Sequence, residues 1–184
     1  MNRVRIAAVI RRHRLVLWRS PHRWFEVVFW PVMDVVLWGS LGVFISQENE
    51  TSRAATPYLL AGLVLFWTLT QVQMTGATSV MEETWTRNLL NVLTTSVTPT
   101  EYLLGVSVFA LGKLALTLIT LAITTTALYG FDLTALGWSV IPVIALLVVN
   151  GWAVALIVIG LILIGLMLFR PQGLFGKREE MVLE

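Results

Sequence analysis

The sequence predicts an all-α membrane protein: a polytopic helical bundle of four transmembrane helices, with an N-terminal interfacial amphipathic helix and a short cytoplasmic helix. Three observations predict this fold class. First, 57% of the 184 residues are hydrophobic and 13% are charged, whereas a soluble domain carries about 25% charged residues. Second, long uncharged stretches exceed the roughly 20 residues that cross a bilayer as a helix. Third, Lys and Arg gather at the N-terminus. A soluble enzyme and a disordered chain are both excluded.

The first element is a basic helix, predicted over residues 4–19. Seven of the thirteen Lys and Arg residues lie in the first 23 positions, and no acid precedes Glu26. On a helical wheel the apolar residues share one arc and arginines fill the rest, which is typical of a helix lying on an anionic leaflet. The residues expected at the membrane surface are Arg5, Arg11, Arg12, Arg14 and Arg19. The alternative is a basic, disordered tail. Ser20-Pro21 then turns the chain into the membrane.

Four apolar stretches follow, and we interpret them as transmembrane helices over residues 24–46, 57–80, 102–128 and 138–169. They are helices because hydrocarbon offers no partner to backbone polar groups, and they do not alternate as barrel strands do. The segments on the N-terminal side hold eleven Lys and Arg residues, and the opposite loops hold only Arg53. The positive-inside rule therefore predicts that both termini are cytoplasmic. We expect a multi-pass protein of the cell (inner) membrane, with a membrane domain over residues 1–169 and a cytoplasmic tail over 170–184.

Polar residues within the predicted spans carry the most information, namely Glu26, Asp34, Gln71, Thr75 and Lys113. An acid near a span centre, such as Asp34, costs about 2.5–3.5 kcal/mol unless it is paired or solvated. Glu26 lies about two turns earlier on a similar face. Lys113 either pairs with Asp34 or snorkels toward the cytoplasm. Either this face looks into the bundle or a wet path, or its role is structural, with a hydrogen bond to another helix or a protonated Asp34. The threonines at helical spacing around Gln71 favour hydrogen bonds between packed helices.

The chain carries no signature of catalysis or of a cofactor. Gly112-Lys113 lacks the upstream glycine of a phosphate-binding loop. His13 and His22 have no Cys or carboxylate near them in sequence, so we expect no metal site. We therefore expect no enzyme activity and no cofactor. We also expect the basic arm to bind lipid phosphate rather than nucleic acid.

Residues 82–95 are predicted to form a short amphipathic helix on the cytoplasmic face, between the second and third spans. Glu82 and Glu83 favour a helix N-terminus. Its apolar stripe consists of Leu89, Leu90 and Leu93. Pro99 breaks the helix, and Thr100 is expected to cap the third span. The stripe has to be buried, either on the bundle and the lipid surface or in a soluble partner.

Three stretches carry a family resemblance: the basic arm with WRSP at 18–21, WPVMDVVLWGSLG at 30–42 and, above all, MEETWTRNLLNVLTTSVTPTEYLLG at 81–105. With them the chain resembles an ABC-2 type transporter permease over residues 1–163. The resemblance implies a subunit that hydrolyses nothing itself. It would pair with a second permease copy and with cytoplasmic ABC ATPase subunits, usually to export a substrate.

The resemblance also implies roles for two segments. The basic arm would be an elbow helix at the membrane surface. Residues 82–95 would be a coupling helix that sits in a groove of the ATPase and converts its closure into rigid-body motion of the spans. The residues implied to face the ATPase or its rim are Glu82, Glu83, Arg87, Leu89 and Leu90, and Leu93 completes the stripe.

Two features depart from that family. Its members usually have six spans and this chain has four, which is expected of a fragment or a composite of a longer permease. In addition, LILIGLMLFRPQGLFGKREE at 161–180 resembles the C-terminus of branched-chain amino-acid ABC importer permeases. The alternatives to an exporter subunit are therefore an importer permease of that kind and a non-transport membrane scaffold or assembly protein.

Overall fold

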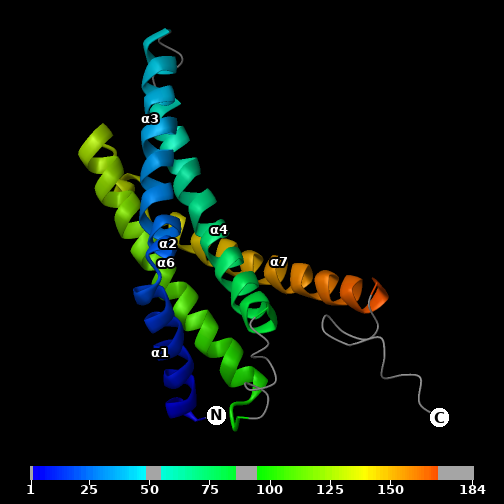
Figure 1. Ribbon diagram of the computed structural model, residues 1–184. Coiled ribbons are helices and arrows are strands. Elements are labelled where there is room, and N and C mark those ends of the chain that lie inside the picture. Colours follow the sequence, from blue (N-terminus) through cyan, green and yellow to red (C-terminus); the bar gives the residue numbers. More distant parts are fainter. Residues whose placement is uncertain (1, 49–54, 86–94, 170–184) are drawn as a thin grey trace, which may run out of the picture.

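The computed structural model describes residues 2–48, 55–85 and 95–169, and in this part of the chain it contains helices and no strand (Figure 1). The elements are α1 (Arg3–Arg19), α2 (Pro21–Trp24), the π-helical turn η1 (Phe25–Phe29), α3 (Trp30–Glu48), α4 (Ala55–Trp85), α6 (Pro99–Tyr129), the 3₁₀ turn η3 (Leu133–Leu136) and α7 (Val140–Phe169). Segments long and apolar enough to cross a membrane are Pro21–Gln47, Ala55–Ser79, Pro99–Tyr129 and Val140–Leu161. The predicted all-α fold with four candidate spans is confirmed, and each span begins within three residues of its predicted start.

Polarity in the bundle is distributed in the opposite way from that of a soluble protein. Large apolar side chains are more than half exposed on the outside, among them Leu37, Phe44, Phe66, Ile123, Leu146 and Leu161. Buried polar side chains include Thr68, Gln71, Thr75, Lys113, Thr117 and Thr125. Such a surface suits hydrocarbon, and polar groups inside a membrane face the bundle interior. The fold is therefore that of a multi-pass membrane protein.

Helices α3, α4 and α6 form the core of the bundle. Its buried apolar cluster consists of Val35, Leu60, Leu63, Val64 and Leu121. At the end away from α1, the Tyr129 hydroxyl donates to the Val36 carbonyl at 3.0 Å. The same ring covers Gly39, where an added Cβ would lie 2.3 Å from ring atoms. Glycine therefore permits this close approach of α6 to α3.

A short loop joins α6 to α7. Gly130 ends α6 with φ of +62°, a left-handed conformation that glycine adopts without strain. The Asp132 side chain then caps η3 by accepting from the Thr134 N–H at 2.9 Å. Hydrogen bonds from Thr134 lower the pKa of the Asp132 carboxyl. These local signals set the direction in which the chain enters α7.

Helix α7 packs on α4 and is steeply inclined to the other helices, with its C-terminal half extending away from the bundle (Figure 1). Gly151 lies against the α4 backbone, since an added Cβ would be 3.2 Å from the Leu69 carbonyl oxygen. Gly76 on α4 likewise meets Ala155, at 3.1 Å. Only 11% of the residues in the most apolar stretch of α7 are buried, so most of the surface of this helix is left for lipid or protein neighbours.

Helix α1 lies along the N-terminal half of α6, so α6 already covers part of its apolar face (Figure 1). Val9 is buried against Gly105, where a Cβ would lie 2.7 Å from the Val9 side chain. His13 is also buried, with its ring 6.1 Å from that of Tyr102. At the end of the pair, the Glu101 carboxylate accepts from the Asn2 backbone N–H at 2.7 Å.

The start of α6 differs from the prediction, because Thr98 and not Thr100 is its cap. The Thr98 hydroxyl accepts from the Glu101 N–H, and the Glu101 carboxylate accepts from the Thr98 N–H at 3.1 Å. This capping box leaves Pro99 at the first helical position, where its missing N–H has no consequence. The sequence contains this signal as Thr-Pro-Thr-Glu, and the prediction placed the cap two residues late.

The helix predicted over residues 82–95 does not begin at Glu82. Helix α4 continues without a break to Trp85, so Glu82 and Glu83 belong to the last turn of α4. The reason is that nothing between the second span and Glu82 stops a helix: the stretch has neither Pro nor a glycine after Gly76. Residues 86–94, with Arg87, Leu89, Leu90 and Leu93, lie outside the described residues, as does the tail 170–184.

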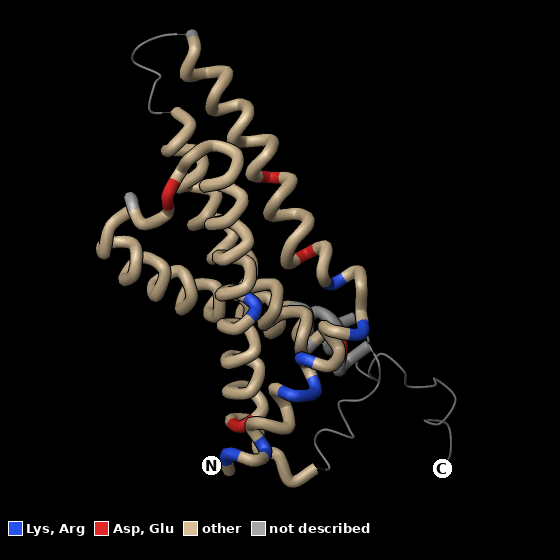
Figure 2. Tube along the Cα trace, turned by 90° about the vertical axis from the view of Figure 1, so that its left-hand side faces the viewer, with Lys and Arg blue, Asp and Glu red and all other residues tan. Residues whose placement is uncertain are grey.

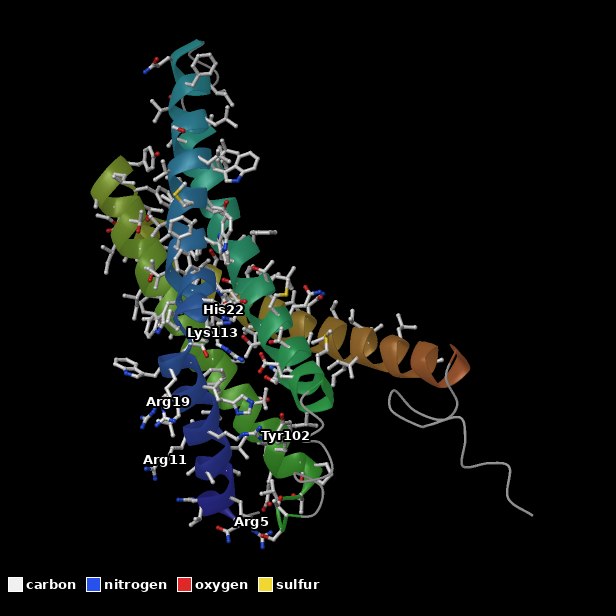
Figure 3. All side chains as sticks on the ribbon, viewed as in Figure 1. Arg5, Arg11, Arg19, His22, Tyr102 and Lys113 are labelled. Atoms are coloured by element: carbon white, nitrogen blue, oxygen red, sulfur yellow. The ribbon has the colours of Figure 1, made fainter. Side chains whose placement is uncertain are left out.

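Charge is segregated along the bundle. In Figure 2 the Lys and Arg residues of the described chain all lie in the lower half, where α1, the end of α4 and the start of α6 meet. The upper half contains acidic residues and no cation among those described. In Figure 3 Arg19, Arg11 and Arg5 follow one another down α1 from the level of Lys113. The arginine-rich segments are therefore gathered at one end.

Candidate functional site

The candidate site is built around an irregular turn at the start of the first span. Residues Phe25–Phe29 form a π-helical turn, in which the Trp30 N–H donates to the Phe25 carbonyl five residues back. The next residue is Pro31, which has no N–H to give to the carbonyls of Glu26 or Val27. Two backbone carbonyls are thus left without their helical donors. Such π turns occur frequently at functional sites.

Polar side chains from two other helices lie next to these carbonyls. The Gln71 amide Nε2 on α4 donates to the Glu26 carbonyl at 2.9 Å. The Thr117 hydroxyl on α6 is 3.5 Å from the Val27 carbonyl and 3.2 Å from the carbonyl of Lys113. The amide of Gln71 is thereby oriented, and its Oε1 is buried without a hydrogen-bond partner among the described residues. An unsatisfied buried acceptor of this kind is costly unless water or a ligand reaches it.

An ion pair lies beside the turn. The Lys113 ammonium on α6 is 3.2 Å from the Glu26 carboxylate, and the Lys113 side chain is 8% exposed, whereas that of Glu26 is 49% exposed. The predicted pairing of Lys113 with Asp34 is therefore wrong. Helix α6 crosses the first span at the level of Glu26, two turns before Asp34, and the flexible lysine reaches the nearer carboxylate.

Asp34 has a different partner. The Trp67 indole N–H on α4 donates to the Asp34 carboxylate at 3.1 Å. The sequence left two interpretations of Asp34 open, a wet path and a structural hydrogen bond. The structure contains the hydrogen bond to another helix. Trp67 carries no charge, so Asp34 has no cationic partner within the described part of the chain.

A cavity of about 260 Å³ opens between the first span and α4, with Lys113 of α6 in its wall. Its polar lining includes Glu26, Gln71 and Lys113, and its apolar lining includes Trp30, Phe66 and Trp67. Trp30 and Phe66 are more than half exposed, so the cavity opens on the outer surface of the bundle. A mostly apolar pocket with a few convergent polar groups is the usual form of a small-molecule site.

A smaller, polar pocket of about 40 Å³ adjoins it and shares Glu26, Thr78 and Lys113 with it. Arg23 and Glu82 line this second pocket and form an ion pair, which ties α2 to the last turn of α4. Figure 3 shows Lys113 and His22, which also line it, together at mid-height of the bundle. The two pockets form one polar region at the boundary between the arginine-rich half and the half in which no described residue is a cation.

The structure brings some predicted residues together and keeps others apart. Glu26, Gln71 and Lys113 meet at the cavity. Thr75 is buried, but its hydroxyl donates to the Gln71 carbonyl of its own helix at 2.7 Å. Most threonines of the predicted stripes do the same, because a short hydroxyl reaches the carbonyl four residues back more easily than another helix. The expectation that the stripes bond between helices therefore holds at Gln71 and fails at the threonines whose hydroxyls donate only within their own helix. Thr117 is intermediate, because its contact with Val27 is longer than the one within its own helix.

The predicted membrane-surface arginines follow the exposed side of α1. Arg11, Arg12, Arg14 and Arg19 are exposed, and Figure 3 shows Arg11 and Arg19 pointing away from the bundle. Arg5 instead lies 3.6 Å from the Glu101 carboxylate. Sequence reasoning missed Trp67, Pro31 and the Arg23–Glu82 pair. The proline gave the clearest signal, since it removes a donor within an apolar span.

No group of three or more His, Cys, Asp or Glu residues able to hold a metal occurs in the described ranges. The chain matches no family model, no curated protein and no solved structure.

Proposed function

We propose that this protein is the membrane-spanning permease subunit of an ATP-driven ABC transporter, most consistent with an exporter, in the cell membrane with both termini cytoplasmic. It hydrolyses nothing itself. It works with a cytoplasmic ATPase and a second permease copy. The proposal rests on the resemblance of residues 81–105 and on one observation, namely the position of that segment relative to the basic arm.

The observation is that both ends of the 86–94 segment lie at the arginine-rich end of the bundle. The end of α4 and the start of α6 are joined there by the Tyr102 hydroxyl, which donates to the Ser79 carbonyl at 3.3 Å. Helix α1 packs on α6 at the same end (Figure 1). By the positive-inside rule, this arginine-rich end would face the cytoplasm, the compartment that contains ATP.

The contacts around the segment suit a coupling role. Helix α4 is continuous from Ala55 to Trp85, so a force on the following residues acts on a whole span. The Arg23–Glu82 pair joins that last turn to the start of the first span. Movement of an ATPase groove would therefore displace two spans as one rigid body. This adds a bracing role for Glu82 to the docking role that the resemblance implies.

The test is co-purification with the cognate ATPase and measurement of substrate-stimulated ATP hydrolysis. Leu89→Asp with Leu90→Asp places two charges on the apolar stripe, and we expect loss of the complex and of the stimulation, because a docked apolar face does not accept unpaired carboxylates. The matched control is Asn88→Asp with Asn91→Asp, which adds the same charge to the same segment off the stripe. We expect the control pair to keep both activities.

Equal behaviour of the two pairs of variants, with the same folded yield, would refute the docking role. A chain that purifies without any ATPase under conditions that preserve such complexes would favour the scaffold alternative.

A further inference from the structure

We infer that the cavity bounded by Glu26, Trp30, Trp67 and Gln71 is a binding site for an amphipathic organic cation, a protonated amine with a compact aromatic or aliphatic body. Four features of the cavity carry the inference: its aromatic walls, a buried acceptor without a partner, an excess of negative charge and an opening at the bundle surface. Binding concerns this chain alone, so the inference does not depend on the ATPase partner.

The buried acceptor is Gln71 Oε1. Gln71 is 2% exposed and lines the cavity, and its amide nitrogen is committed to the Glu26 carbonyl, so the oxygen cannot exchange places with it. This oxygen has no donor among the described residues. A carbonyl oxygen held in this way is complementary to a hydrogen-bond donor and not to an anion.

The formal charge around the cavity is negative. Glu26 lines the wall and shares its carboxylate with Lys113. Asp34 stands directly behind the wall and bonds to the indole of Trp67, and no cation compensates it in the described part of the chain. Glu26 and Asp34 thus carry two negative charges in and beside the cavity wall, against the one positive charge of Lys113. In the adjoining pocket Arg23 is paired with Glu82 and adds no net charge. A ligand carrying one positive charge restores neutrality, whereas an anion would add to the excess.

The walls suit the same chemistry. Three of the lining side chains, Trp30, Phe66 and Trp67, are aromatic. Aromatic rings attract cations by about 0.5–2 kcal/mol and also bury an apolar body. Trp30 and Phe66 are 55% and 54% exposed, so the cavity is open where the bundle meets its surroundings. An amphiphile already dissolved at the membrane interface can enter without passing through the core.

The test uses the purified full chain in lipid nanodiscs, with tritiated 4-phenylbutylammonium as the probe and empty nanodiscs as the blank. The expected result is saturable binding. Two competitors share the phenylbutyl body and differ in the head: 4-phenylbutan-1-ol is neutral and 4-phenylbutanoate is anionic. We expect each to compete at least tenfold more weakly than the unlabelled amine, because they lack a charged donor for Gln71 and Glu26.

Two sets of variants locate the site. Glu26→Gln with Lys113→Met removes both charges of the pair without leaving a buried ion unpaired. The net charge around the cavity stays the same, so the expected fall in affinity of about tenfold reports the loss of the Glu26 carboxylate as a direct partner of the amine. Trp30→Leu is expected to lower it about fivefold. Its matched control is Trp38→Leu, the same substitution on the same helix, in a neighbouring groove that shares Phe66 with the cavity but none of its polar residues, and it should leave the affinity unchanged. Thermal unfolding of each variant verifies that it is folded.

The outcomes are distinct. Absence of saturable binding, or equal weakening by Trp30→Leu and Trp38→Leu, would overturn the assignment. Equal competition by the alcohol would mean that the cavity accepts an apolar chain such as that of a lipid, and stronger competition by the carboxylate would mean an anion site; either overturns the inference. Amine binding by a chain that associates with no ATPase would refute the proposed function and support this site. ATPase association by a chain that binds no amine would refute this site and leave the proposed function in place.

Discussion

Glu26 and Lys113 differ in how far they are removed from solvent, and this difference decides which of them depends on the other. The Lys113 side chain is 8% exposed and has Glu26 as its ionic partner, whereas Glu26 is half exposed. A buried charge that loses its partner is strongly destabilising, while removal of both members of a pair is often neutral. The pair therefore stabilises the bundle mainly by making a buried lysine tolerable.

We predict that Glu26→Gln lowers the stability of the purified protein by about 1–3 kcal/mol, because it leaves the Lys113 ammonium with a neutral partner. Adding Lys113→Met to that variant should recover most of the loss. Thermal unfolding in a mild detergent measures both. If the double variant were no more stable than the single one, the buried ammonium would not be the source of the loss.

Asp34 is held by one hydrogen bond from an indole, and substitutions there test this directly. Asp34→Asn retains an oxygen that accepts from Trp67 Nε1, so we expect a near-normal yield of monodisperse protein. Asp34→Lys offers no acceptor and places an ammonium beside the indole, so we expect the yield to fall severalfold. A normal yield from Asp34→Lys would show that the site is wet and not packed.

At the scale of elements, Pro31 determines how the first span connects to its neighbours. Because it lacks an N–H, Gln71 supplies a hydrogen bond that the helix cannot make for itself. In Pro31→Ala the restored N–H gives the turn a donor of its own. We predict that Gln71→Leu destabilises the natural protein by about 1 kcal/mol or more and the Pro31→Ala variant by clearly less. A double-mutant cycle on unfolding free energies measures this coupling, and a coupling of zero would contradict it.

The closest approach of α1 to α6 depends on a small residue. A Cβ at Gly105 would lie 2.7 Å from the side chain of Val9, whereas one at Gly112 on the same helix meets nothing within 4 Å. We predict that Gly105→Leu releases α1, lowers stability by about 1–3 kcal/mol and speeds tryptic cleavage at Arg11 and Arg12. Gly112→Leu is the matched control and should behave like the natural protein. Similar cleavage of both variants would show that α1 is not held by this contact.

At the scale of the whole molecule, the segregation of charge gives a topology that can be measured. The chain has no cysteine, so single cysteines report cleanly. We predict that Arg11→Cys and Asn91→Cys react with a membrane-impermeant thiol reagent only after cells are permeabilised, and that Thr134→Cys reacts in intact cells. Residues 11 and 91 on opposite sides of the membrane would rule out the proposed coupling role altogether.

The contrast between α7 and the other spans also belongs to this scale. Helices α3, α4 and α6 share one buried core, whereas α7 touches α4 through Gly76 and Gly151 and leaves most of its apolar surface open. Its sequence is the most apolar of the four. The predicted span 138–169 is nevertheless longer than a bilayer needs, so the sequence defined its bounds less closely than those of the other spans. Its steep inclination could not be read from composition, because packing against neighbours sets the tilt of a helix.

The sequence by itself determined the helical class, the candidate spans and the gathering of arginines, because apolar length and charge order are properties of the chain read in one dimension. It also contained the proline that creates the irregular turn. Only the tertiary structure decided that Lys113 meets Glu26, that Asp34 meets Trp67 and that Gln71 faces a cavity. The reason is physical: which side chains meet depends on how each helix is rotated about its axis and where it crosses the next. Nearly uniform apolar spans carry little of that information.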